Sequence, residues 1–274
     1  MFEVRPKRQT TFSSAMTMFE LIYHNVVRSI RSQHRNALVA ILLNMLQAVM
    51  FVAAFYAMFS LLGARSAGLR GDFLIYLMSG VFLYMTHVKA LGAVAGAEGP
   101  SSPMMQHAPM NTIIAICSAA LGCLYVQTLS LFVILFIYHV SWNPVEIEQP
   151  IQAYSMLLLA WGTGCALGLV LLAIKPWLPQ LVSIFQTVYQ RANMIASGKM
   201  FVANTLPSFM LAMFDWNPLF HCIDQARGFA FINYVPRHTS WEYAAILGGV
   251  FIMLGLMGEF YTRKHASLSW NARR

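Results

Sequence analysis

Few charged side chains in this sequence could act on a substrate, and one of them lies inside an apolar run. Arg191 follows Tyr189 and Gln190 in the stretch from Leu181 to Val202. An arginine at the centre of a membrane helix costs about 2.5–3.5 kcal/mol on insertion scales, so it faces a protein interior or a water-filled path. We predict that Arg191 and Gln190 form a polar lining for a translocated substrate. The alternative is a charge that snorkels or pairs with a neighbouring carbonyl.

Aromatic residues make up 13% of the chain, and several fall in or near the apolar runs. Sugar rings stack on aromatic faces, so a path that carries sugars would use such residues. Tyr84, Trp161 and Tyr189 are the candidates that we name for this path. Membrane-interface belts and packed cores also use aromatic side chains, and that simpler interpretation stays open for each of them.

Motifs for catalysis or nucleotide binding are not found in the sequence. The Gly198-Lys199 pair is followed by Met200 and lacks the upstream glycine of a P-loop, whose backbone amides hold phosphate. Gly162, Gly164 and Gly168 lie inside an apolar run, where small residues allow helices to pack closely. The four cysteines form no metal-binding pattern with the histidines, so we predict packed thiols and no metal or cofactor bound by this chain.

A membrane-embedded glycosyl- or acyltransferase remains the rival hypothesis from a different class. Such an enzyme needs polar catalytic residues at a membrane interface, and only the scattered Asp72, Asp215 and Asp224 could serve. A structural membrane scaffold is a third hypothesis, and it leaves Arg191 without a role.

The composition is that of an integral membrane protein. The chain has 274 residues, of which 58% are hydrophobic and only 10% are charged, whereas soluble domains have about 25% charged residues. The net charge of +8 does not indicate nucleic acid, because the basic residues lie at the ends of apolar runs. We therefore predict an all-α membrane protein that contacts membrane lipids and binds no nucleic acid.

Six apolar segments are long enough to cross a bilayer, which requires about 20 residues each. Twelve of the 18 Lys and Arg residues fall on one side of these segments, four on the other and two within the fifth. This asymmetry places both termini in the cytoplasm. The predicted spans are Ala37–Leu62, Phe73–Ala93, Ile113–Val140, Ile151–Ile174, Leu181–Val202 and Trp241–Tyr261.

The predicted organisation has three parts. Residues 1–36 are a cytoplasmic N-terminus with an amphipathic helix that lies on the membrane surface, because its apolar residues recur at helical spacing and basic residues mostly fall outside that stripe. Residues 37–261 form the six-helix transmembrane domain, and residues 262–274 form a cytoplasmic tail. Within the domain, residues 203–240 form a long outer-face loop with short re-entrant helices.

The stretch from Leu206 to Arg227 is apolar but interrupted. Pro207 opens it, and Pro218 cannot continue an incoming helix but suits the first turn of a new one, with Asn217 as N-cap. We predict two short helices joined by a turn. Asp224 lies three residues before Arg227, so the two side chains can form a local pair. His221 is predicted to be packed in the interior.

Several residues of this stretch keep a definite spacing, namely Pro207, Asn217, Pro218, Leu219, His221, Asp224 and Arg227. In type and spacing they resemble the segment before the last membrane helix of ABC-2 type exporter permeases, in particular the branch that exports capsular polysaccharide and O-antigen. The resemblance implies a homodimer in the bacterial inner membrane. It also implies a separate ABC ATPase subunit that binds ATP and Mg, and a lipid-linked polysaccharide as substrate.

The resemblance further implies a coupling helix in the loop after the second span. The end of that loop, from Ala108 to Ile114, is similar to the capsule-exporter version, although the polar, glycine-rich stretch 96–106 departs from it. Export of another lipid-linked polymer or of a small molecule stays open as an alternative within transport. The residues expected to contact the ATPase are Met105, Gln106, His107, Ala108 and Pro109.

Overall fold

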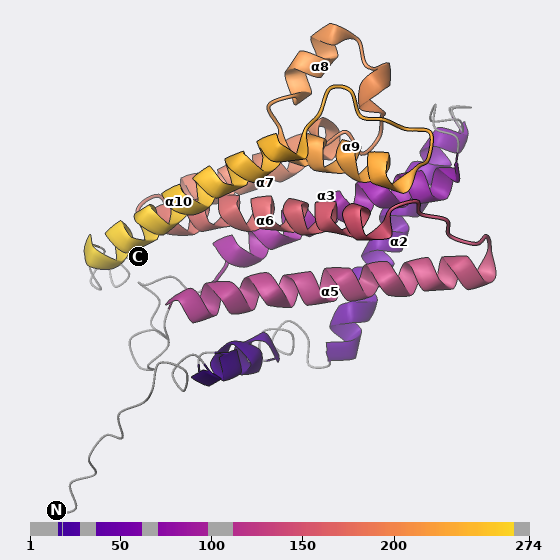
Figure 1. Cartoon of the computed structure of the whole chain (residues 1–274). Helices are drawn as coiled ribbons and strands as arrows, with labels where there is room; N and C mark the ends of the chain where they lie inside the picture. Colours follow the sequence, from indigo (N-terminus) through magenta and orange to yellow (C-terminus); the bar gives the residue numbers. More distant parts are fainter. Residues whose placement is uncertain (1–15, 18, 28–36, 62–70, 98–111, 266–274) are drawn as a thin grey trace, which may run out of the picture.

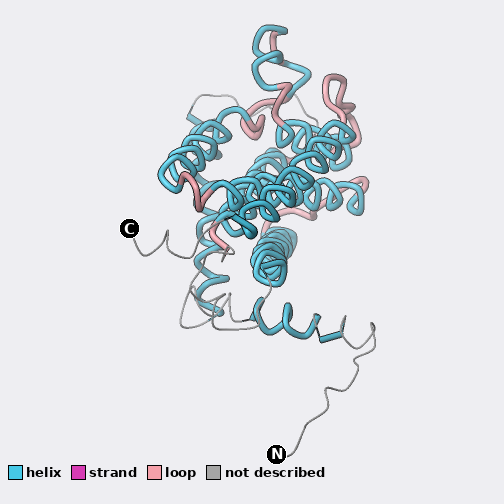
Figure 2. The backbone as a smooth tube through the Cα atoms, turned by 90° about the vertical axis from the view of Figure 1, so that its left-hand side faces the viewer, coloured by secondary structure: helices cyan, strands magenta, loops and turns pink. Residues whose placement is uncertain are grey.

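The computed structural model describes residues 16–17, 19–27, 37–61, 71–97 and 112–265, and within these ranges it contains helices and turns but no strand (Figure 1). The predicted all-α class is thus confirmed for the described residues. Viewed along the bundle, most long helices are seen end-on (Figure 2). The helices are α2 (Ala37–Leu61), α3 (Phe73–Ala95), α5 (Thr112–Ser141), α6 (Pro150–Ile174), α7 (Pro179–Ala196), α8 (Ser208–Phe214), α9 (Pro218–Ala230) and α10 (Trp241–His265), with a 3-10 turn at Ala203–Thr205.

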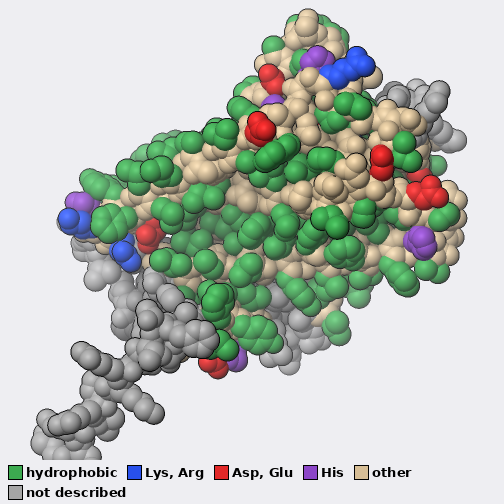
Figure 3. Space-filling view, in the orientation of Figure 1, with side chains coloured by type: hydrophobic (Ala, Val, Ile, Leu, Met, Phe, Trp, Pro, Cys, Tyr) green, Lys and Arg blue, Asp and Glu red, His purple; other side chains and the backbone are tan. Residues whose placement is uncertain are grey.

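Five of the described helices, α2, α3, α5, α6 and α10, are long and apolar enough to cross a membrane. Their outer faces carry apolar side chains, such as Leu42, Phe136 and Met257, which are all more than half exposed. Hydrophobic side chains cover the flank of the bundle in Figure 3, while charged groups lie toward its ends. A water-soluble protein does not expose so large an apolar surface, so these faces suit lipid.

Helices α3 and α6 run in the same direction through the centre of the bundle. A Cβ built on Gly164 would lie 2.4 Å from the main-chain oxygen of His87, so the two backbones are in close contact there. Further along, the Lys175 ammonium donates to the carbonyl of Ala95 at 3.1 Å. The predicted role in close packing is confirmed for Gly164. It is also confirmed for Gly168 but wrong for Gly162, because a Cβ built there meets no atom of another described segment within 4 Å.

Helix α10 also packs on α6 in the same direction. Gly248 of α10 lies against the Thr163 side chain of α6. Near the C-terminal ends of the two helices, the Thr262 hydroxyl donates to the Ala173 carbonyl at 2.9 Å. Residue numbers therefore increase in the same direction along α6 and α10. Because α6 and α10 run in parallel, the chain between them must return along the bundle.

That return is made by α7. The Tyr84 hydroxyl donates to the Gln190 carbonyl at 3.1 Å, and His87 bonds the Tyr189 hydroxyl at 2.9 Å. From Tyr84 to His87 the residue numbers rise along α3, while those of their partners fall from Gln190 to Tyr189, so α7 is antiparallel to α3.

The predicted limits of the fifth span, Leu181–Val202, were wrong. Helix α7 has 18 residues and ends at Ala196, and Gly198 at φ 74° turns the chain away from the helix. It is also not among the helices apolar enough to be counted as spans, because polar residues recur along its length. At about 1.5 Å per residue, α7 is about 27 Å long, slightly less than a hydrocarbon core.

The segment 19–27 before α2 is helical, and the carbonyl of Ile22 accepts a bond from Ser118 of α5 at 3.3 Å. Phe19 and Tyr23 are exposed on this segment. A helix in the predicted N-terminal region is therefore confirmed, while its attachment to a membrane surface stays a prediction.

The contact of Gly164 with α3 yields a matched test. We expect Gly164→Ala to lower the free energy of unfolding by about 1–3 kcal/mol, because the added methyl group meets the His87 carbonyl. Gly162→Ala, with nothing near its Cβ, should stabilise α6 by about 0.5–1 kcal/mol. Thermal unfolding of both purified variants in detergent measures the difference; equal melting temperatures would contradict the close α3–α6 packing.

Candidate functional site

The interruption at Asp215–Pro218 separates α8 from α9 as the sequence predicts. The Asn217 side-chain oxygen accepts from the Leu219 amide at 3.1 Å, which makes it the N-cap of α9, and Pro218 occupies the first helical turn. The Asn217 amide group also donates to Asn193 at 2.8 Å and to the Ala196 carbonyl at 3.0 Å. One side chain therefore starts α9 and attaches it to the end of α7.

Arg227 makes the second attachment between α9 and the end of α7. Its side chain is 1% exposed and donates to the carbonyls of Gly198, Lys199 and Phe201 at 2.9, 2.7 and 2.8 Å. Its guanidinium also lies 4.1 Å from the centre of the Tyr76 ring on α3. The 197–202 turn is therefore held by one buried cation that binds its main-chain oxygens.

The predicted local pair between Asp224 and Arg227 was wrong. Asp224 accepts hydrogen bonds from the Tyr234 hydroxyl and, at 2.7 Å, from the Thr239 hydroxyl. Burial and the Asp224 carboxylate raise the pKa of the Tyr234 phenol well above its usual value, so this group stays a proton donor. Asp224 thus fastens the loop that leads to α10, while Arg227 fastens the turn after α7.

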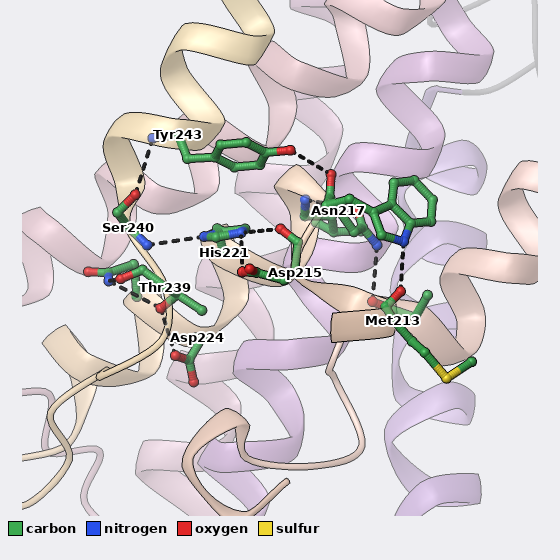
Figure 4. A network of polar contacts seen from close by, with 12 residues as sticks. Met213, Asp215, Asn217, His221, Asp224, Thr239, Ser240 and Tyr243 are labelled. Atoms are coloured by element: carbon green, nitrogen blue, oxygen red, sulfur yellow. Dashed lines mark hydrogen bonds and ion pairs between the residues drawn. The ribbon is translucent and has the colours of Figure 1, made fainter. Parts of the chain in front are cut away.

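His221 is packed in the interior, as predicted, and Figure 4 shows it between the loop before α10 and the α8–α9 junction. The Ser240 amide donates to Nδ1 at 3.1 Å, so Nε2 carries the proton and donates to the Asp215 carbonyl at 2.7 Å. The Tyr243 ring lies 4.6 Å from the imidazole, centre to centre, and its hydroxyl donates to the Trp216 carbonyl. This histidine joins α8, α9 and α10.

Three of the five predicted path residues come together. Tyr84 bonds the main chain of Gln190, and Tyr189, the preceding residue, bonds His87. Arg191, next along α7, is exposed on the surface of the single chain.

Trp161, the remaining predicted path residue, is not joined to this group by any described contact. It lies on α6 and donates to the Ala120 carbonyl of α5 at 2.9 Å, within a different packing cluster. The predicted coupling residues, from Met105 to Pro109, lie outside the described residues.

Sequence reasoning gave no role to His87 or Lys199. His87 is fully buried and ties α3 to α6 and α7, and the sequence offers no signal for this beyond a lone histidine in an apolar run. Lys199 is 1% exposed. Its position in an apolar segment could have singled it out from the sequence, because lysines inside membranes usually have a function.

These features define a multi-span helical membrane protein with a broken, internally bonded segment before its last helix. No protein-family model matches the chain. It is 21% identical over 202 residues to a polysialic acid transport protein KpsM of Escherichia coli, covering 72% of this chain and 76% of the relative. A second KpsM protein of the same species is 22% identical over 206 residues with the same coverage. The resemblance to ABC-2 type permeases of the capsular-polysaccharide branch is thereby confirmed.

The three carbonyl bonds of Arg227 predict a large effect of a charge-conserving change. We expect Arg227→Lys to lower the free energy of unfolding by roughly 3 kcal/mol, because one ammonium cannot reproduce the planar fork and charged hydrogen bonds contribute about 1.5–3 kcal/mol each. Arg237→Lys, at an exposed loop position, should change it by less than about 0.5 kcal/mol. Unfolding of both variants in the same detergent measures the two changes in stability. Equal changes would contradict this role of Arg227.

Proposed function

We propose that this chain is the permease subunit of an ATP-driven exporter that moves a lipid-linked surface polysaccharide across the bacterial cytoplasmic membrane. Its similarity to two polysialic acid transport proteins over 72% of its length is the observation that carries the proposal. Two copies of the chain would form the path and bind two copies of a separate ATPase, which would hold ATP and Mg. The residues from Met105 to Pro109 would contact that ATPase.

Helix α7 supplies the sixth crossing in this proposal. Because α6 and α10 run in the same direction, the chain must cross the membrane once between them. This crossing brings the number of spans to six. Helix α7 is antiparallel to α3 and therefore to α6 and α10, and it is the longest described helix in that interval. Its polar character then distinguishes it from the five apolar spans.

The charge distribution supports a cytoplasmic location for one end of the bundle. Lys175 joins the ends of α3 and α6, and Arg263 and Lys264 follow at the end of α10, on the left of Figures 1 and 3. Positive residues concentrate at the cytoplasmic ends of membrane helices. The end of α9 meets the start of α6, where the Gln149 amide donates to the Phe229 carbonyl, so α9 would lie toward the outer face.

The exposed polar face of α7 supports its place beside the path. Ser183, Thr187 and Arg191 recur every fourth residue and are all exposed in the single chain. The Thr187 hydroxyl already donates to the Ser183 carbonyl at 2.9 Å. Lipid would leave the Arg191 guanidinium without water or acceptors, whereas a second copy or a hydrated substrate would supply them. We infer that this face of α7 meets the path between two copies, where an acidic polymer would contact Arg191.

The transferase alternative gains no support from the positions of Asp72 and Asp224, two of its three candidate residues. Asp72 caps α3 and accepts from the Tyr138 hydroxyl, and Asp224 is bonded by Tyr234 and Thr239. These carboxylates fasten helices and loops. Export of another lipid-linked polymer or of a small molecule remains compatible with the same architecture.

The proposed place of Arg191 on the export path is tested by substitution. We expect Arg191→Ala to lower the amount of polysaccharide at the cell surface roughly tenfold or more, with polymer accumulating inside, because a charged contact in a low-dielectric path is lost. The amount of chain in the membrane should not change, since Arg191 is exposed. Arg237→Ala is the matched control for loss of an exposed arginine. Normal surface polysaccharide in Arg191→Ala cells would remove Arg191 from the path.

A further inference from the structure

Lys199 is a buried basic residue that neither the resemblance nor the predicted path explains. Its side chain is 1% exposed, and among the described residues its ammonium has no hydrogen-bond partner. A charged group in such a position is costly unless something compensates for the lost water. The side chain therefore needs another source of stabilisation.

Three aromatic rings surround the ammonium. Lys199 Nζ lies 3.5 Å from the centre of the Tyr84 ring, 5.0 Å from that of Phe55 and 5.3 Å from that of Phe51. All three distances are within the range at which a cation is attracted to a ring face, and the attraction is strongest where water is excluded. We call these three rings the aromatic cage. Two of them come from α2 and one from α3.

The main chain that carries Lys199 is fixed independently of α2. Its carbonyl accepts from Arg227 at 2.7 Å, and its Cα lies 2.9 Å from a Cβ built on Gly80 of α3. Helix α2 is less enclosed than α3, because 22% of its apolar stretch is buried against 78% for α3, and Asn44 bonds it to Lys89 of α3 and to α5. Of the two helices that form the cage, α2 therefore has the smaller buried face.

We propose that Lys199 is a positioning residue that holds α2 against α3 and the 197–202 turn when the path is closed. The inference rests on the proposed function in one respect: α2 moves away when the path opens. That movement removes the rings of Phe51 and Phe55 from the ammonium, which then requires water or an acidic group of the substrate. The side chain thus has two stabilised positions, caged in the closed chain and hydrated in the open one, as a two-state element requires.

The test measures how often α2 separates from the cage. Val52 lies on α2 and is 6% exposed, so a cysteine placed there reacts with a small polar maleimide only when α2 moves. The reporter is Val52→Cys in the full chain with Cys117, Cys123, Cys165 and Cys222 changed to Ala, in lipid nanodiscs without ATPase or polymer. We expect Lys199→Met, which keeps length and removes charge, to raise the labelling rate roughly tenfold, the size of one desolvated cation–π contact.

Matched variants separate a positioning role from general packing. Lys199→Arg keeps the charge and should label like the parent, whereas Phe55→Leu should label faster. Combining Lys199→Met with Phe55→Leu should add little to either single change, because both remove the same contact. A second reporter, Ala244→Cys on α10, is 0% exposed in the parent and should be unaffected by any of these changes.

Two results would overturn the proposal. One is a Lys199→Met rate equal to the parent rate at Val52→Cys; the other is an equal increase at both reporters, which would mean general loosening. If Lys199→Met does not fold, Phe55→Leu takes its place in the test. A Phe55→Leu labelling rate at Val52→Cys equal to the parent rate would then overturn the proposal. Because the assay contains neither ATPase nor polymer, its failure leaves the export proposal standing, and failure of the export proposal would not change the labelling rates.

Discussion

The attachment of α9 to the end of α7 is the constraint on which the rest of this structure depends. The last carbonyls of any helix lack partners within the helix, and such groups are costly away from water. Here Asn217 satisfies the carbonyl of Ala196, and Arg227 binds three carbonyls in the turn that follows. The N-cap and one buried arginine of a short helix therefore allow α7 to end inside the protein.

This attachment determines where the polar groups of α7 can lie. With its end fixed by α9 and its middle bonded to Tyr84 and His87 of α3, α7 has a defined rotation. That rotation directs Tyr189 inward and leaves Arg191 exposed. The 197–202 turn after α7 places Lys199 beside the aromatic rings of α2. Fixing one helix end thus positions both the proposed polar surface of the path and the contact that we assign to its closure.

The sequence predicted those features that depend on local chemistry. The N-cap of Asn217 and the helix start at Pro218 follow from backbone preferences, and five spans follow from apolar length. The partners of Asp224 could not be predicted, because Tyr234 and Thr239 reach it only through the folded loop. A spacing of three residues shows that two side chains can meet, but long-range contacts decide whether they do.

The early end of α7 illustrates a second limit. Apolar residues continue to Val202, but Gly198 adopts a positive φ that ends the regular path of the chain. Hydropathy alone records the composition of this turn and not its geometry. The roles of Lys199 and His87 were missed for a related reason, since each depends on partners more than 70 residues away.

In the proposed function, this chain works as the membrane subunit of an ATP-driven exporter. The most direct measurement is purification of the tagged full chain from its native membrane in a mild detergent, followed by identification and quantification of the proteins that accompany it. We expect an ABC-type ATPase in an amount close to that of the tagged chain. Repeated purification of intact chain without any such ATPase would contradict it.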